Sequence, residues 1–129
     1  MQTKVLILVV DDDVVIQDLI AENLKEAGFA TDTVSTGEDA IKKLDAAKGK
    51  YRALVTDINL GKEKLEGWDV ARHAREIDPN FPIVYASGRD AHDWAAKGVP
   101  NSIMLAKPFA SAQLVTAVSQ LLNSSPPSE

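Results

Sequence analysis

The chain has 129 residues, 45% of them hydrophobic and 26% charged, with a formal net charge of −5 and no cysteine. This length suits one compact domain, and an acidic balance without a basic stripe argues against direct contact with nucleic acid. The absence of cysteine excludes disulfides and thiol chemistry, and no signal peptide or membrane-spanning stretch is present, so we expect a cytoplasmic protein without a membrane partner.

The first part of the chain alternates between strand and helix patterns. Residues 5–10 (VLILVV) form the continuous apolar run of a strand buried on both faces. A helical period begins at Val14 and is expected to end at Gly28, with Asp13 as the N-cap. The predicted buried stripe of this helix is Ile16, Leu19, Ile20, Leu24 and Ala27.

Three more strands follow at regular intervals. Residues 30–34 alternate like a half-exposed edge strand, and Ser35 with Glu38 predicts a capping box for the next helix. Residues 53–56 form a buried run whose following helix is stopped by Pro79, and residues 82–87 form a fourth run.

The last part of the chain supplies a weak and then a strong helix pattern. Residues 89–98 predict a short helix, residues 103–106 a fifth strand, and the apolar residues from Leu114 to Leu122 a final helix. Five strand-helix alternations indicate a single α/β domain with a parallel sheet over residues 1–122. The polar, Pro-rich residues 123–129 predict a flexible tail.

Polar side chains follow four of the predicted strands: Asp11 and Asp12, Asp57, Ser87, and Lys107. Ligands of open parallel sheets bind at the carboxyl ends of the strands. If the first and third strands are neighbours, three carboxylates converge, and their pKa values rise unless a cation is bound. Mg²⁺ prefers carboxylate oxygens and shares its remaining positions with phosphate oxygens, so these residues predict a metal and a phosphate.

Four motifs, LILVVDD, LVTDINL, VYASG and LAKPF, together resemble the receiver domain of two-component response regulators over residues 4–122. The resemblance implies a flavodoxin-like (βα)5 fold, a doubly wound parallel five-stranded sheet with strand order 2-1-3-4-5. It also implies that Asp57 accepts a phosphoryl group from a phosphohistidine or a small phosphodonor. Asp11, Asp12, Asp57 and the backbone carbonyl of Asn59 would hold Mg²⁺, or Mn²⁺ in its place.

By the same resemblance, Lys107 would pair with the phosphoryl oxygens and Ser87 would donate its hydroxyl to one of them. The movement of Ser87 would change the face formed by the fourth helix, fifth strand and fifth helix. The implied partners are a sensor histidine kinase or phosphotransfer protein, and a downstream protein that the residues do not identify.

The chain departs from the family pattern at several positions. Gly61 stands where the family usually has proline, and Gly67 follows two residues later than the family glycine, which predicts a longer loop after Asp57. Met104 replaces a Tyr or Phe that swings inward on activation, and the fourth helix is expected to be short.

Isolated residues receive simpler interpretations. His73 and His92 are expected to be solvated side chains and not metal ligands, and Trp68 and Trp94 are expected to pack locally.

Several functions remain open from the residues. The leading hypothesis is a single-domain response regulator, which is a phosphoacceptor and not a turnover enzyme. The alternatives are the receiver of a hybrid histidine kinase or phosphorelay, a phosphate-independent scaffold, and an aspartyl phosphatase. The phosphatase lacks its usual acid/base carboxylate, because Asn59 stands two residues after Asp57.

Overall fold

The computed structural model describes residues 4–61, 65–88 and 93–124. Within these ranges every strand is followed by a helix. In chain order the elements are β1 (Leu6–Val10), α1 (Val14–Glu26), β2 (Ala30–Val34), α2 (Gly37–Ala46), β3 (Ala53–Asp57), α3 (Gly67–Ile77), β4 (Ile83–Ser87), α4 (Trp94–Lys97), β5 (Ile103–Ala106) and α5 (Ser111–Ser124).

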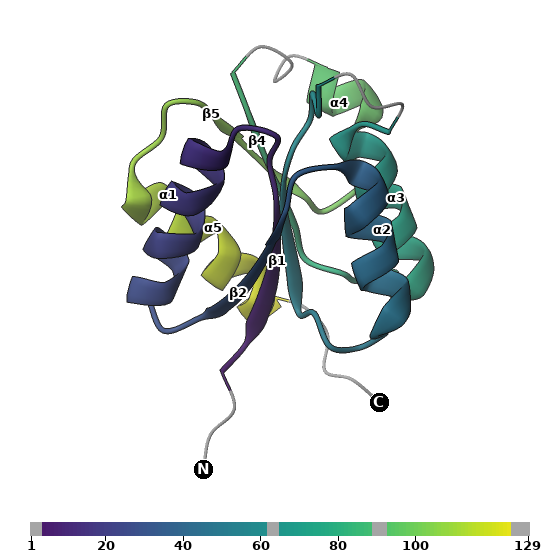
Figure 1. Ribbon diagram of the computed structural model, residues 1–129, viewed down its shortest axis with the longest axis horizontal. Coiled ribbons are helices and arrows are strands. Elements are labelled where there is room, and N and C mark those ends of the chain that lie inside the picture. Colours follow the sequence, from purple (N-terminus) through teal and green to yellow (C-terminus); the bar gives the residue numbers. More distant parts are fainter. Residues whose placement is uncertain (1–3, 62–64, 89–92, 125–129) are drawn as a thin grey trace.

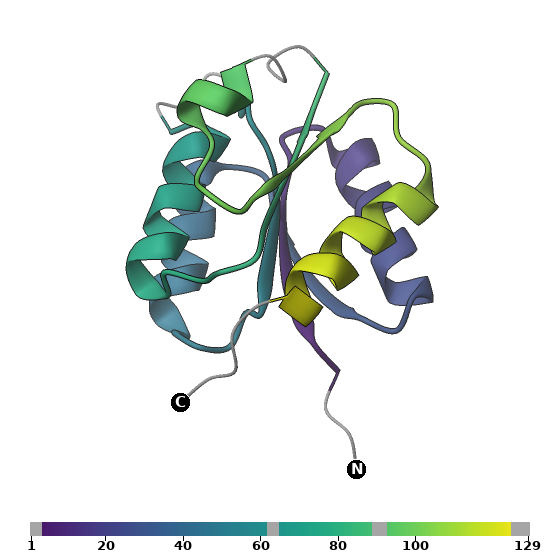
Figure 2. The same ribbon diagram turned by 180° about the vertical axis from the view of Figure 1, so that it is seen from behind.

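The five strands of the described residues form one parallel sheet in the order β2-β1-β3-β4-β5. The helices α1 and α5 cover one face, and α2 and α3 cover the other (Figure 1). The same two layers are seen from behind in Figure 2. The predicted α/β doubly wound fold and strand order are confirmed, and the carboxyl ends of the strands share the upper edge of the sheet in Figure 1.

The β1 strand contributes to both hydrophobic layers, which explains its unbroken apolar run. Leu8 and Val10 pack with the residues of α2 and α3, whereas Ile7 and Val9 pack with those of α1 and α5. All four side chains have no exposed surface. Successive side chains of a strand point to opposite faces, so a strand between two helical layers needs apolar residues at every position.

The ends of α1 are as predicted. Asp13 is the N-cap, and its carboxylate accepts hydrogen bonds from the backbone of Val15 at 3.0 Å and Ile16 at 3.4 Å. Gly28 follows the helix with φ +98°, a left-handed conformation that glycine adopts without steric cost.

The predicted buried stripe of α1 is partly wrong. Leu19 is 54% exposed and Ala27 is exposed, whereas Gln17 is only 7% exposed. The Gln17 amide donates to the carbonyl oxygens of Asp11 (3.1 Å) and Val34 (2.8 Å), at the ends of β1 and β2. These bonds hold the helix in a rotation that turns Leu19 toward solvent.

The predicted capping box of Ser35 and Glu38 is also wrong. The N-cap of α2 is Thr36, whose hydroxyl accepts from the backbone of Asp39 at 3.0 Å. The Ser35 hydroxyl instead accepts a 3.2 Å hydrogen bond from Gln17 Nε2. A side chain that binds α1 is not free to cap α2, so the helix begins one residue later.

The fourth helix is short and the fifth is long, as the sequence predicts. The short α4 has four residues, and His92 lies outside the described residues. The α5 helix continues to Ser124, two residues past the predicted end of the domain, and residues 125–129 are outside the described ranges. No helix in the described part of the chain combines the length and apolar character that crossing a membrane requires.

His73 is partly exposed and joins two helices. Its Nε2 lies 2.7 Å from Asp45 Oδ1, and the His73 side chain is 27% exposed. The prediction of a solvated histidine is therefore right only in part, because Asp45 on α2 faces His73 across the α2–α3 contact.

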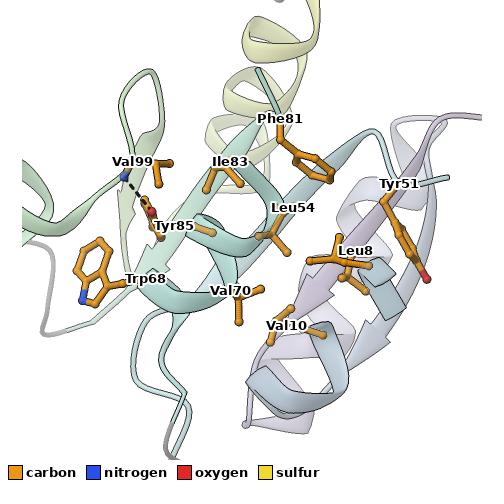
Figure 3. Close-up of a cluster of buried hydrophobic side chains, with 14 of the residues drawn as sticks. Leu8, Val10, Tyr51, Leu54, Trp68, Val70, Phe81, Ile83, Tyr85 and Val99 are labelled. Atoms are coloured by element: carbon orange, nitrogen blue, oxygen red, sulfur yellow. Dashed lines mark hydrogen bonds between the residues drawn. The ribbon is translucent and has the colours of Figure 1, made fainter. Parts of the chain in front are cut away.

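Tyr85 is the centre of a buried aromatic contact beneath the segment between α4 and β5. The centroid of its ring lies 4.8 Å from the centroid of the Trp68 ring. Its hydroxyl accepts a 3.1 Å hydrogen bond from the backbone N–H of Val99 (Figure 3). Met104 is the residue of β5 opposite Tyr85.

The two tryptophans contact nearby residues, as expected. Trp68 packs against Tyr85. Trp94 is 37% exposed, and its indole donates a hydrogen bond to Ser102 Oγ at 2.8 Å.

Replacing Tyr85 with phenylalanine should lower the free energy of unfolding by about 1–3 kcal/mol, because the buried Val99 N–H loses its acceptor. Urea denaturation of both proteins measures the difference. Tyr51→Phe is the matched control, since its hydroxyl bonds Asp32, a side chain 33% exposed that water can reach. Equal losses in the two variants would contradict a special role for the Tyr85 hydroxyl.

Candidate functional site

Three carboxylates meet where β1 and β3 end. Asp11 and Asp12 follow β1, and Asp57 is the last residue of β3, the neighbouring strand. One carboxylate oxygen of each residue lies within 4.8 Å of those of the other two. Asp11 is fully buried, Asp57 is half-buried and Asp12 is exposed. The predicted convergence of the three residues is therefore observed.

Backbone amides orient the two less exposed carboxylates. Asp11 Oδ1 accepts a 2.9 Å hydrogen bond from the backbone of Asp13, and Asp57 Oδ1 accepts one of 2.7 Å from Ile58. The tight turns after each strand thus use one oxygen of each carboxylate and leave the other oxygen for the centre of the site.

Lys107 supplies the positive charge of the site. Its Nζ lies 2.9 Å from Asp11 Oδ2 and 3.3 Å from Asp57 Oδ2. Its backbone N–H donates to the carbonyl oxygen of Ser87 at 2.8 Å. Lys107 and Ser87, which is 1% exposed, are therefore joined at the ends of β5 and β4.

The electrostatics of the site favour an added cation. Burial raises the pKa of Asp57 from its ordinary 3.8 to about 6; the Lys107 charge opposes this rise and the Asp11 charge adds to it. Burial lowers the pKa of Lys107, but the hydrogen bond to Asp11 and the two carboxylate charges outweigh it, so that pKa lies above its usual value. One ammonium faces three carboxylates, and negative charge remains in excess.

The donor set fits a hard divalent cation. The three side chains offer only carboxylate oxygens, which are the preferred ligands of Mg²⁺, Mn²⁺ and Ca²⁺. A divalent ion at this place would neutralise the excess charge that burial makes costly. The site could therefore hold a metal ion.

The loop after β3 is closed at its base. The Gly67 N–H donates to the Ile58 carbonyl oxygen at 2.7 Å, and a Cβ at Gly67 would overlap the carbonyl of Asp57. The sequence marked Gly67 only as a change in spacing, so this support of the Asp57 backbone was missed. A glycine directly before a helical period was the available signal.

Asn59 lies on this loop and is exposed. Its side-chain oxygen accepts a 3.1 Å hydrogen bond from the backbone of Gly61. Residues 62–64 of this loop, which the sequence predicts to be longer than in the family, lie outside the described residues.

A cluster of three carboxylates with an opposing lysine thus lies at the carboxyl edge of a doubly wound sheet, the edge at which ligands of such sheets bind. Residues 7–119 match the response regulator receiver domain family, and the chain belongs to that family.

Curated relatives include the transcriptional regulatory protein QseB of Haemophilus influenzae, 30% identical over 118 residues that make up 90% of this chain and 52% of the relative. Another is the alkaline phosphatase synthesis transcriptional regulatory protein PhoP of Bacillus subtilis, 31% identical over 92% of this chain and 49% of that one. The chain thus spans about half the length of these relatives.

A solved response regulator receiver protein from Sinorhizobium medicae is 50% identical, with a TM-score of 0.90, and the match covers 94% of this chain and 96% of that one. The receiver domain of NtrX from Brucella abortus is 29% identical with a TM-score of 0.78, over 92% and 99% of the two chains. The similarity therefore covers more than nine tenths of the chain.

Proposed function

We propose that this chain accepts a phosphoryl group on Asp57 from the phosphohistidine of a sensor kinase or phosphotransfer protein. The observation that carries the proposal is the placement of Asp57 Oδ2, 3.3 Å from Lys107 Nζ and within the three-carboxylate cluster. An oxygen of Asp57 forms a bond to phosphorus as the phosphorus–nitrogen bond breaks, and the imidazole nitrogen leaves with the electron pair. The product is an acyl phosphate.

The neighbouring residues would position the group and neutralise its charge, which is the main requirement of phosphoryl transfer. Asp11, Asp12, Asp57 and the backbone carbonyl of Asn59 would hold Mg²⁺, and Mn²⁺ could replace it. When bound, the metal supplies charge neutralisation at the phosphoryl oxygens.

Lys107 and Ser87 would contact the transferred group from the β4 and β5 side. Lys107 Nζ already lies within hydrogen-bond distance of Asp11 and Asp57, so its ammonium is close to the place that a phosphoryl group on Asp57 would occupy. Ser87 would donate its hydroxyl to another oxygen. Because the Ser87 carbonyl accepts from the Lys107 amide, a shift of one strand end would reach the other.

The output would be a change of the face that α4, β5 and α5 form, read by a downstream protein and not by direct contact with nucleic acid. With Met104 opposite Tyr85, this switch would work without an aromatic side chain at that position of β5. The same chemistry serves a single-domain cytoplasmic regulator, a hybrid kinase receiver or a phosphorelay. In each case the chain is a phosphoacceptor that assists its own phosphorylation and dephosphorylation. A phosphate-independent scaffold would need none of the charged residues of the site.

Incubation with phosphoramidate and Mg²⁺ should add the mass of one phosphoryl group to the intact protein, and Asp57→Asn should abolish the gain. Intact mass spectrometry measures both, with and without Mg²⁺. Asp18→Asn, an exposed residue of α1, is the control that keeps the gain. A folded wild-type protein that gains no mass, beside a receiver that does, would favour the scaffold.

A further inference from the structure

A tight turn after β3 brings backbone against one of the three carboxylates. Gly61 has φ +80°, and its N–H donates to the Asn59 side chain at 3.1 Å. A Cβ added to Gly61 would lie 3.0 Å from Asp12 Oδ2 and 3.9 Å from its Cγ. The Asp12 carboxylate therefore occupies the space that a side chain at residue 61 would need.

The residues that precede Gly61 are held in place. Ile58 has no exposed surface and Leu60 is 2% exposed, so the residues before Gly61 are anchored in the core. The carbonyl of Ile58 is also bound by the Gly67 amide at 2.7 Å. Asp12 is exposed, in contrast. Any added side chain would therefore displace the Asp12 carboxylate before it displaced the backbone.

Cations differ in how well they tolerate such a displacement. Mg²⁺ requires near-octahedral geometry with oxygens at about 2.0–2.1 Å, whereas Ca²⁺ accepts flexible geometry at about 2.3–2.6 Å. A shift of a few tenths of an ångström is comparable to the difference between the two ions. The placement of Asp12 thus bears on which ion the site prefers.

We propose that Gly61 is a specificity-determining residue of the metal site: by lacking a side chain, it lets Asp12 lie close enough for a small cation and favours Mg²⁺ over Ca²⁺. This inference rests on the proposed function, because it assumes that the three carboxylates bind Mg²⁺. The proline usual at this position in receivers has φ near −65° and could not adopt the turn seen here.

The test compares Gly61→Ala with Gly49→Ala by calorimetric titration with Mg²⁺ and with Ca²⁺. Gly49 has a similar φ of +86°, but a Cβ there meets nothing within 4 Å, so it reproduces the backbone strain alone. Gly61→Ala should weaken Mg²⁺ binding by about tenfold or more, the range of changes beside metal ligands, and Ca²⁺ binding much less. Gly49→Ala should leave both affinities unchanged, with a similar fall in melting temperature.

A double variant isolates the contact between the two residues. In an Asp12→Ala background no carboxylate is displaced, so adding Gly61→Ala should have no further effect on Mg²⁺ affinity. If Gly61→Ala alone fails to fold, the double variant should be the more stable of the two, because they share the backbone strain and only the contact with Asp12 is removed; equal instability of the two variants would overturn the inference.

The remaining outcomes are decisive. Equal Mg²⁺ affinity in Gly61→Ala and wild type, or equal losses for Mg²⁺ and Ca²⁺, overturns the inference and leaves the proposed function standing. If the wild-type protein binds neither ion, both the proposed Mg²⁺ site and this inference are overturned.

Discussion

Replacing Gly67 with alanine is expected to lower the free energy of unfolding by more than about 4 kcal/mol. Single substitutions rarely cause so large a loss, and severe steric conflict is one of the few causes. The new Cβ would overlap the Asp57 carbonyl oxygen and lie 2.9 Å from both the Asp57 carbonyl carbon and Ile58 Cα. These are backbone atoms at the end of a buried strand, so no flexible side chain can move away. Urea denaturation monitored by circular dichroism measures the loss.

Gly88→Ala is the control for this substitution, since a Cβ there meets nothing within 4 Å. It should change the stability little. A Gly67→Ala protein as stable as Gly88→Ala would contradict the close contact between α3 and the end of β3. If Gly67→Ala does fold, it should also bind Mg²⁺ more weakly, because Asp57 would have shifted.

The stability of the wild-type protein without Mg²⁺ should fall as the pH rises through about 6, relative to Asp57→Asn. Folding raises the pKa of Asp57 from 3.8 to about 6, chiefly by burial. A raised carboxyl pKa stabilises the fold while the group is protonated, and this contribution is lost as the pH passes the folded value. A shift of about two units corresponds to about 3 kcal/mol.

The measurement is thermal or urea unfolding of both proteins from pH 4.5 to 8 in a chelating buffer. At pH 7.5 the Asp57→Asn variant should be the more stable, and adding Mg²⁺ should stabilise the wild type selectively. Asp18→Asn should follow the wild-type curve. If the stabilities of wild type and Asp57→Asn change equally with pH, the surroundings of Asp57 do not destabilise its ionised carboxylate.

The strands and the site residues could be predicted from sequence because both depend on local patterns. A continuous apolar run indicates a strand between two layers, and the polar residue that ends it lies at the carboxyl edge, as Asp57 does. The order of the strands needed the family resemblance, since no local pattern encodes which strands pair.

The predictions were wrong where contacts between distant parts of the chain determine the local structure. The helical period placed Leu19 inward, but the bonds of Gln17 to the ends of β1 and β2 set the rotation of α1. Ser35 had the right spacing for a cap and was used by Gln17 instead. A polar side chain that satisfies distant carbonyls leaves no periodic signal in the sequence.

The hydrogen bond that closes the β3–α3 loop also bears on how this chain tolerates a change of length. The Ile58 carbonyl and the Gly67 amide fix both ends of the loop at the strand, so extra residues between them leave the position of Asp57 unchanged. Lengthening a closed loop from about eight to about ten residues costs only about 0.2 kcal/mol of closure entropy. Extra residues on the α3 side of Gly61 should therefore cost little stability, whereas extra residues before Gly61 would move the turn that lies against Asp12.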